Sequence, residues 1–137
     1  MITRDVVGIY DGTYTVYLGI LPIATGKQND VIITKVANDS VSLSLKNFMV
    51  NIGGGDIPLG DISMKHCHVT IKNNTYTIKG KREFFALSPP IGDCWLTPEG
   101  TVVNGVANMT INIIANIPTP GTTLRVSYKG TRKETEP

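Results

Sequence analysis

The strongest constraint in this sequence is an alternation of apolar and polar residues with a period of two. It is clearest in VSLSLK at 41–46, and it returns in NMTINI at 108–113 and LRVSYK at 124–129. Successive side chains of an extended strand point to opposite faces, so this pattern predicts strands with one buried face. No window of the sequence holds a sustained apolar stripe with the period of a helix, and the chain is therefore predicted to be all-β.

Short turns and one change of phase divide the pattern. Asn38-Asp39-Ser40 and Asn73-Asn74 are turn-forming runs, and the second predicts the tip of a hairpin. Beyond Asn47 the apolar positions shift by one residue, to 48, 50 and 52. Because one extra residue in a strand moves the following side chains to the opposite face, we expect a β-bulge near Asn47.

Two segments are predicted to interrupt strands. GGGDIPLGD at 53–61 is rich in glycine and is expected to form a flexible loop. The run from Cys94 to Val103 contains Pro98-Glu99-Gly100. Since proline has no N–H to donate to a neighbouring strand, we expect Pro98 to lie at a sheet edge or a bulge and to break this run.

The number of strands restricts how the sheet is arranged. Eight or more short strands joined by turns would leave two exposed edges in an open sheet, and such edges are prone to pair with other chains. An antiparallel up-and-down meander of this kind must therefore either close into a β-barrel of about 8–10 strands or fold into two packed sheets, and closure removes the exposed edges. One domain is expected over residues 1–137, with a polar C-terminal tail at 132–137.

Composition and charge argue against several functions. The net charge is +2 and basic residues gather only at 79–82 and 131–133, so nucleic acid is not an expected partner. No apolar run approaches the ~20 residues that cross a bilayer, which predicts no transmembrane segment. No two carboxylates share a strand face near an apolar cleft, and Gly53-Gly54-Gly55 lacks the lysine and serine of a phosphate-binding loop. We expect no enzyme activity and no cofactor.

Both histidines of the chain lie in KHCHV at 65–69. On a strand, residues two apart share a face and stand about 6.6 Å from each other, so His66 and His68 are weak candidates for metal ligands. Cys67 occupies the opposite face together with Val69. Because that face is the apolar one, the favoured interpretation is that the two histidines lie on a solvent-exposed face and form no metal site.

Two cysteines, Cys67 and Cys94, permit one intramolecular disulfide and match no four-ligand zinc pattern. Cys67 is interpreted as a small core residue, as free cysteine often is. The pattern leaves open whether the two cysteines are bonded to each other.

Three stretches carry a resemblance to a known family: VGIYDGTYTV at 7–16, VSLSLKNFMVNIGGGDIPLGDI at 41–62 and TLRVSYKGTRK at 123–133. Together they resemble the calycin-like β-barrel domain of secreted and lipoprotein-type proteins of Bacteroidetes, over nearly the whole chain. The most specific part is the run at 43–48 followed by the run at 57–62.

This resemblance implies a lipocalin-like barrel in an extracytoplasmic location, either the periplasm or the cell surface. It also implies binding of a small hydrophobic molecule or a lipid. Lipocalins carry Gly-x-Trp on the first strand, where this chain has Gly8-Ile9-Tyr10. The basic residue of the last strand that packs over the tryptophan would correspond to Arg125 or Lys129, and the sequence does not choose between them.

The interior of an eight-stranded barrel is either filled by side chains or holds one small ligand. We expect a non-catalytic barrel that binds a small hydrophobic ligand or lipid in its interior, with hydroxyl groups such as those of Tyr14 and Tyr76 orienting it. The alternative is a structural or protein-interaction module with a packed barrel, and the oligomeric state stays open. The candidate ligand-binding residues are Tyr14, Phe48, Val69, Tyr76, Phe84, Met109 and Ile111.

Overall fold

The computed structural model describes residues 6–51, 56–86, 93–115 and 122–133, which form nine strands and no helix. Among these residues no helix is present that could cross a membrane. The strands are β1 (Gly8–Leu18), β2 (Leu21–Ala37), β3 (Ser40–Asn51), β4 (Asp56–Lys72), β5 (Thr75–Gly80), β6 (Glu83–Ala86), β7 (Asp93–Val103), β8 (Val106–Ala115) and β9 (Thr122–Arg132).

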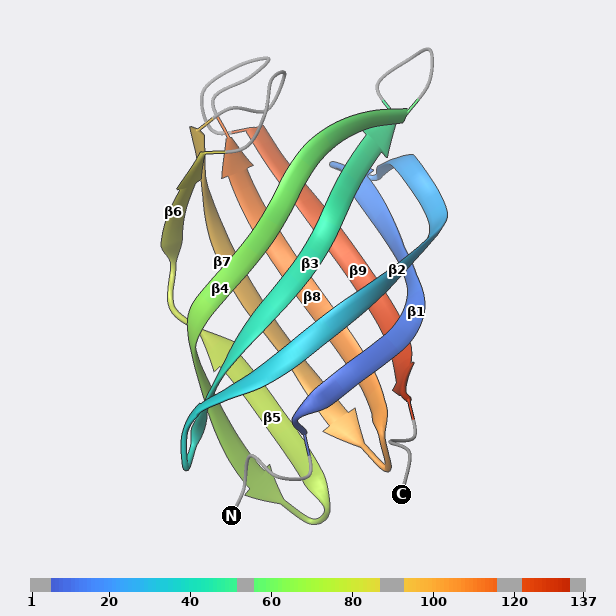
Figure 1. The fold of residues 1–137 in the computed structure, drawn as a ribbon. Coiled ribbons are helices and arrows are strands. Elements are labelled where there is room, and N and C mark those ends of the chain that lie inside the picture. The colour runs from blue at the N-terminus through green and yellow to red at the C-terminus, as the bar shows by residue number, and fades with distance from the viewer. Residues whose placement is uncertain (1–5, 52–55, 87–92, 116–121, 134–137) are drawn as a thin grey trace.

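These strands form one antiparallel sheet in the order β5-β4-β3-β2-β1-β9-β8-β7-β6, and β5 also pairs with β7 (Figure 1). The second pairing closes a ring of eight strands, to which β6 adds a ninth. The prediction of an antiparallel barrel that closes on itself is confirmed. In Figure 1, β1 begins and β9 ends at the lower end of the barrel.

The alternating pattern separates the inside of the barrel from the outside. In β8, Ala107, Met109, Ile111, Ile113 and Ala115 are buried, while the residues between them are partly or fully exposed. The same division holds on β1, where Tyr10, Tyr14 and Val16 face inward. Since each strand contributes one apolar face, closure of the sheet brings these faces together into a single core.

The predicted turns and bulge are present. Asn73 and Asn74 both have positive φ, 51° and 63°, as a two-residue hairpin turn that matches strand twist requires. Asn47 has φ of 55°, and the pairing of β3 with β4 shifts from Leu45–Ile62 to Phe48–Gly60 across it. The bulge leaves the Asn47 N–H without a partner on the neighbouring strand. The carboxylate of Asp61 accepts a hydrogen bond from this N–H at 2.9 Å and so satisfies it.

Two predicted interruptions are wrong for the residues that the structure describes. Residues 56–61 belong to β4, so the predicted loop at 53–61 is strand from Asp56 onward, and 53–55 lie outside the described residues. Strand β7 runs unbroken through Pro98. On one side of β7, pairing with β6 ends at Leu96 and pairing with β5 starts at Glu99, so Pro98 has no register partner there. The proline thus occupies a locally unpaired position inside a continuous strand.

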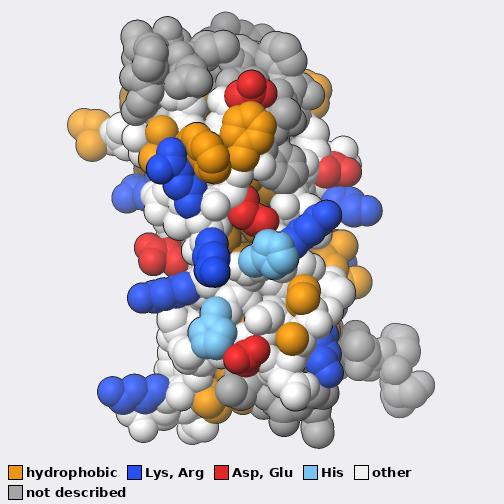
Figure 2. Space-filling view, turned by 90° about the vertical axis from the view of Figure 1, so that its left-hand side faces the viewer, with side chains coloured by type: hydrophobic (Ala, Val, Ile, Leu, Met, Phe, Trp, Pro, Cys, Tyr) orange, Lys and Arg blue, Asp and Glu red, His pale blue; other side chains and the backbone are white. Residues whose placement is uncertain are grey.

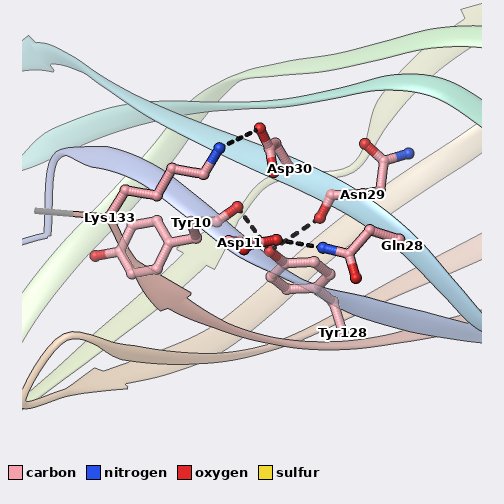
Figure 3. Close-up of polar contacts among 7 residues, drawn as sticks. All are labelled: Tyr10, Asp11, Gln28, Asn29, Asp30, Tyr128 and Lys133. Atoms are coloured by element: carbon pink, nitrogen blue, oxygen red, sulfur yellow. Dashed lines mark hydrogen bonds and ion pairs between the residues drawn. The ribbon is translucent and has the colours of Figure 1, made fainter.

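The barrel also extends into the predicted C-terminal tail. Arg132 is the last residue of β9, and the Lys133 N–H donates a hydrogen bond to the carbonyl of Ile9 at 2.8 Å. The Lys133 ammonium pairs with Asp30 at 3.0 Å, as Figure 3 shows. Residues 132 and 133 are therefore part of the barrel, and 134–137 lie outside the described residues.

The contact between β1 and β9 depends on two glycines that face each other. Gly12 and Gly130 are register partners, and a methyl group on Gly130 would lie 2.3 Å from the hydroxyl oxygen of Tyr128. The Tyr128 ring thus fills the space beside Gly130, whereas a methyl group on Gly12 would lie 2.1 Å from the backbone carbonyl oxygen of Lys129. The Tyr128 hydroxyl donates a hydrogen bond to the carbonyl of Tyr10 at 3.0 Å (Figure 3).

We predict that Gly130→Ala destabilises the barrel by about 1–3 kcal/mol, because the new methyl group must displace the buried Tyr128 ring. Urea denaturation followed by circular dichroism measures the free energy of unfolding. Ser127→Ala, at an exposed position of the same strand, is the control and should change this free energy by less than about 0.5 kcal/mol. An equal effect of the two substitutions would contradict the packing described for Tyr128.

Candidate functional site

The predicted ligand-binding residues divide between the inside and the outside of the barrel. Five are buried in the interior with at most 4% of their surface exposed: Tyr14, Phe48, Val69, Met109 and Ile111. Tyr76 is partly buried and packs against the same core. Phe84 is 56% exposed on the outer face of β6, so it does not lie with the other candidates in the interior.

The hydroxyl of Tyr14 is engaged by the backbone of β3. It donates a hydrogen bond to the carbonyl of Met49 at 3.0 Å and accepts one from the Met49 N–H at 3.0 Å. The ring contacts Phe48 with a centroid distance of 5.4 Å and an interplanar angle of 42°. Because its only donor is already used, the Tyr14 hydroxyl connects two strands across the core and has no O–H left to donate to a ligand.

Tyr10, the residue compared above with the lipocalin tryptophan, is completely buried. Its hydroxyl donates a hydrogen bond to the carbonyl of Val6 at 2.7 Å. Burial raises the pKa of Tyr10, and the positive charge of Arg132 partly opposes that rise. Arg132 is also the register partner of Tyr10 on β9.

The basic residue beside Tyr10 is therefore Arg132, and neither predicted candidate occupies that place. Lys129 is exposed, and the guanidinium of Arg125 lies over the Tyr17 ring at 4.7 Å on the outside of the barrel. The alternation along β9 explains the difference, because Arg125 and Lys129 fall on its outward face.

Side chains fill the interior wherever the structure describes it. Inward residues from well-separated strands show no exposed surface, as in Val16 on β1, Ile62 on β4 and Leu96 on β7. A solvent-filled cavity would leave accessible surface on the side chains around it. The inward side chains of the described residues are therefore closely packed against one another.

The barrel wall is interrupted between β4 and β6 within the described residues. Pairing of β4 with β5 reaches Cys67–Gly80, and the Lys81 N–H donates to the carbonyl of His66 at 3.4 Å. Beyond this point β4 pairs only with β3, β6 pairs only with β7, and the two strands diverge in Figure 1. The carboxylate of Glu83 bridges the start of the opening by accepting a hydrogen bond from the Lys65 N–H at 3.2 Å.

An aromatic cluster lies on the outer face beside this interruption. Phe84 and Trp95 are register partners whose rings meet edge to face at 5.4 Å, and the Arg82 guanidinium lies 4.4 Å from the centre of the Trp95 ring. Ile114, the partner of Trp95 on β8, is 40% exposed, and Trp95 itself is 39% exposed. We call Arg82, Phe84, Trp95 and Ile114 the Trp95 face. Figure 2 shows hydrophobic side chains gathered on the upper part of this side, with basic side chains beside and below them.

Sequence reasoning missed this cluster, although the sequence holds a signal for it. Phe84 and Phe85 are adjacent, and adjacent side chains of a strand point to opposite faces, so one phenylalanine had to face outward. The pairing with β7 decides which phenylalanine faces outward, because Phe84 lies opposite the outward-facing Trp95. A strand of only four residues is too short for its own alternation to decide the matter.

The two histidines lie on the exposed face of β4, as predicted. The Nδ1 atom of His68 lies 3.7 Å from a carboxylate oxygen of Asp39, and both side chains are more than half exposed. The described part of the chain holds no group of three histidine, cysteine, aspartate or glutamate residues placed to bind a metal. His68 and Asp39 therefore form a solvent-exposed contact at the lower end of the barrel.

Cys67 and Cys94 are both buried free thiols. Burial raises the pKa of Cys67 to about 12, and the nearby negative charge of Glu83 adds to the rise. Burial likewise raises the pKa of Cys94 to about 11, with a further contribution from Asp93. Since the thiolate is the reactive form of cysteine, neither residue has the environment of a nucleophile at neutral pH.

We predict that both thiols resist modification by a disulfide reagent at pH 8 in the folded protein. In denaturant, two thiols per chain should react rapidly. A colorimetric thiol titration with and without urea measures both quantities. No reaction in urea would show that the two cysteines are bonded, and rapid reaction without urea would show that the thiols are exposed.

The raised pKa values also predict a loss of stability in alkaline solution. The unfolded chain releases the Cys67 proton near pH 9, whereas the folded chain holds it until about pH 12. The unfolded state therefore binds fewer protons in this window, and the free energy of unfolding falls as pH rises from 9 toward 12. Urea denaturation at pH 8, 9 and 10 measures this decline. Cys67→Ala should decline less steeply over the same range, and identical slopes would contradict the assignment.

Comparison with known proteins gives one family and one similar fold. A family model described as a calycin-like beta-barrel domain matches residues 6–131. A crystal structure provisionally described as an outer membrane protein of Bacteroides fragilis has a TM-score of 0.72 and 23% sequence identity to this chain. The match covers 96% of this chain and 52% of that one, so this chain spans about half the length of its structural neighbour. No curated protein gives a significant match to the sequence.

Proposed function

This chain belongs to the calycin-like β-barrel domain family, and from that premise we propose that it is a non-catalytic binding barrel that makes its contacts through the outer wall. The observation that carries the proposal is the burial of the interior. Inward-facing side chains of β1, β4, β7 and β8 leave almost no exposed surface, and the Tyr14 hydroxyl bonds to the backbone. Among the described residues, this burial leaves little interior volume for a ligand, and the Tyr14 hydroxyl has no O–H left to donate to one.

The Trp95 face supplies exposed apolar and aromatic surface that a partner is able to contact. Phe84, Trp95 and Ile114 expose apolar surface in a single row across β6, β7 and β8. Aromatic residues and arginine are enriched at protein–protein interfaces, because they bury large areas at a small cost in side-chain entropy. The cation–π contact between Arg82 and Trp95 orders two of these side chains before any partner binds.

The absence of catalysis is supported by the state of the polar groups near the core. The buried tyrosine hydroxyls donate to backbone carbonyls, as Tyr10 and Tyr128 show. The buried thiols hold their protons at neutral pH. The Glu83 carboxylate accepts a backbone hydrogen bond from β4. Each group therefore has a structural partner or a protonation state that does not suit acid–base or nucleophilic chemistry.

We also propose an extracytoplasmic location, in the periplasm or at the cell surface. The support is the description of the Bacteroides fragilis chain with the same fold as an outer membrane protein. That chain is about twice as long as the matched region, so the proposal concerns the location of this barrel and not the activity of the longer protein.

A second candidate function is binding of a small hydrophobic molecule or lipid in the interior. Barrels of this fold bind such molecules in lipocalin-like proteins, and the interrupted wall between β4 and β6 favours the idea here. Met64 lies inside the barrel on the part of β4 that pairs with β3 alone, and a methionine side chain adapts its shape easily. Opening this wall would break the contact between Glu83 and the Lys65 N–H.

We predict that the folded protein shows no saturable binding of a naphthylamine fluorescent probe or of oleate with a dissociation constant below ~10 µM. Fluorescence titration and native mass spectrometry measure the binding. The matched variants are Glu83→Ala, which removes the bridge across the wall, and Met64→Trp, which adds volume to the interior. One oleate per barrel, bound more tightly by Glu83→Ala and lost in Met64→Trp, would overturn the outer-wall proposal and establish the interior site.

A further inference from the structure

We propose that the free edge of β6 and the Trp95 face bind a second copy of this chain, in a two-fold symmetric pair with the two β6 strands antiparallel. The inference rests on the proposed function, since it names the partner that the outer wall contacts. Three observations carry it: an unpaired strand edge, a charge distribution that complements itself, and an exposed aromatic row.

The first observation is the edge of β6. All four residues of this strand pair with β7, from Glu83–Leu96 to Ala86–Asp93. In the described sheet β6 is the terminal strand, and no described strand pairs with its other side. An unpaired edge presents N–H and C=O groups that another extended polypeptide is able to satisfy. Because β4 diverges from β6 above Lys65, no described strand lies against that edge (Figure 1).

The second observation is the order of charges along the outward face. Arg82 lies just before β6, Phe84 lies within it, and Ala86 at its end is paired with the exposed Asp93. The strand is thus basic at one end and acidic at the other, with an aromatic ring between. A two-fold axis near Phe84 would bring Arg82 of each copy toward Asp93 of the other. Such an arrangement is self-complementary, as an isologous interface requires.

The third observation is the apolar row itself. Phe84, Trp95 and Ile114 are each at least 39% exposed, and the two-fold axis would join two such rows end to end at Phe84. Natural proteins commonly protect an edge strand with charged side chains, whereas the central outward residue of β6 is a phenylalanine. An aromatic side chain next to a free edge is stabilised when a second strand pairs there, because cross-strand aromatic contacts then remove its ring from water.

The expected strength follows from the size of the surface. Stable interfaces bury about 800 Å² on each partner, and a four-residue strand edge with the exposed ring of Phe84 at its centre supplies less. We therefore expect a reversible dimer that forms at high concentration. A lipid surface would use the apolar row but would leave the strand edge and Asp93 without a role. The second copy accounts for all three observations.

Sedimentation velocity of the full chain between about 1 and 500 µM tests the proposal. Wild type should show a concentration-dependent monomer–dimer equilibrium, and Phe84→Glu should remain monomeric over the whole range. Arg82→Asp and Asp93→Arg should each raise the dissociation constant at least about five-fold, since each places like charges together. Combining the two substitutions should restore the dimer, because it recreates opposite charges across the axis.

Controls separate the interface from general effects. Lys129→Glu changes an exposed charge on β9 and should leave the equilibrium unchanged. Circular dichroism and thermal unfolding check that each variant is folded. A wild type that stays monomeric at all concentrations, or a Phe84→Glu variant that still dimerises, would overturn the proposal. Interior binding of oleate would overturn the proposed function separately, whatever the mass of the protein.

Discussion

Closure of the sheet is the constraint on which the rest of this structure depends. The pairings of β1 with β9 and of β5 with β7 turn a meander into a ring, and they give every apolar strand face a common interior. Closure requires close packing at the join. Gly12 and Gly130 provide it between β1 and β9, since a side chain on Gly12 would meet the backbone of β9 and the Tyr128 ring occupies the space beside Gly130. The hydroxyl of Tyr128 also donates a hydrogen bond to the backbone of β1. The same residue therefore packs between β1 and β9 and links the two strands.

The gap in strand pairing between β4 and β6, seen within the described residues, explains several features that otherwise look unrelated. Strand β5 ends at Gly80, β6 begins at Glu83, and both pair with β7 along different parts of its length. Between them Pro98 is accommodated because that position of β7 has no partner on this side. Above this point β4 and β6 separate, Glu83 reaches across to the Lys65 N–H, and the edge of β6 is left free beside Phe84 and Trp95. The buried inward side chains and the free edge of β6, both within the described residues, support a barrel that acts through its outer wall.

The fold and much of its detail were predictable from residue pattern, while most of the candidate site was not. Period-two alternation predicted strands, the slip at Asn47 predicted the bulge, and Asn73-Asn74 predicted a hairpin turn, because each depends on neighbouring residues alone. The outward position of Phe84 depends on pairing with Trp95, which is distant in the sequence. The choice of Arg132 as the partner of Tyr10 depends on the register between β1 and β9. The engagement of the Tyr14 hydroxyl by Met49 depends on contact across the interior.

The sequence by itself determined that this chain is all-β, where most strands run, which face of each strand is apolar, and that the histidines lie on a solvated face. These properties follow from side-chain geometry within single strands, for which the pattern is sufficient. Only the tertiary structure decided that the interior is filled where it is described, that the wall parts between β4 and β6, and that Arg82, Phe84, Trp95 and Ile114 meet outside it. These properties arise from the register and ends of strands distant in the chain, and alternation carries no information about which strands become neighbours.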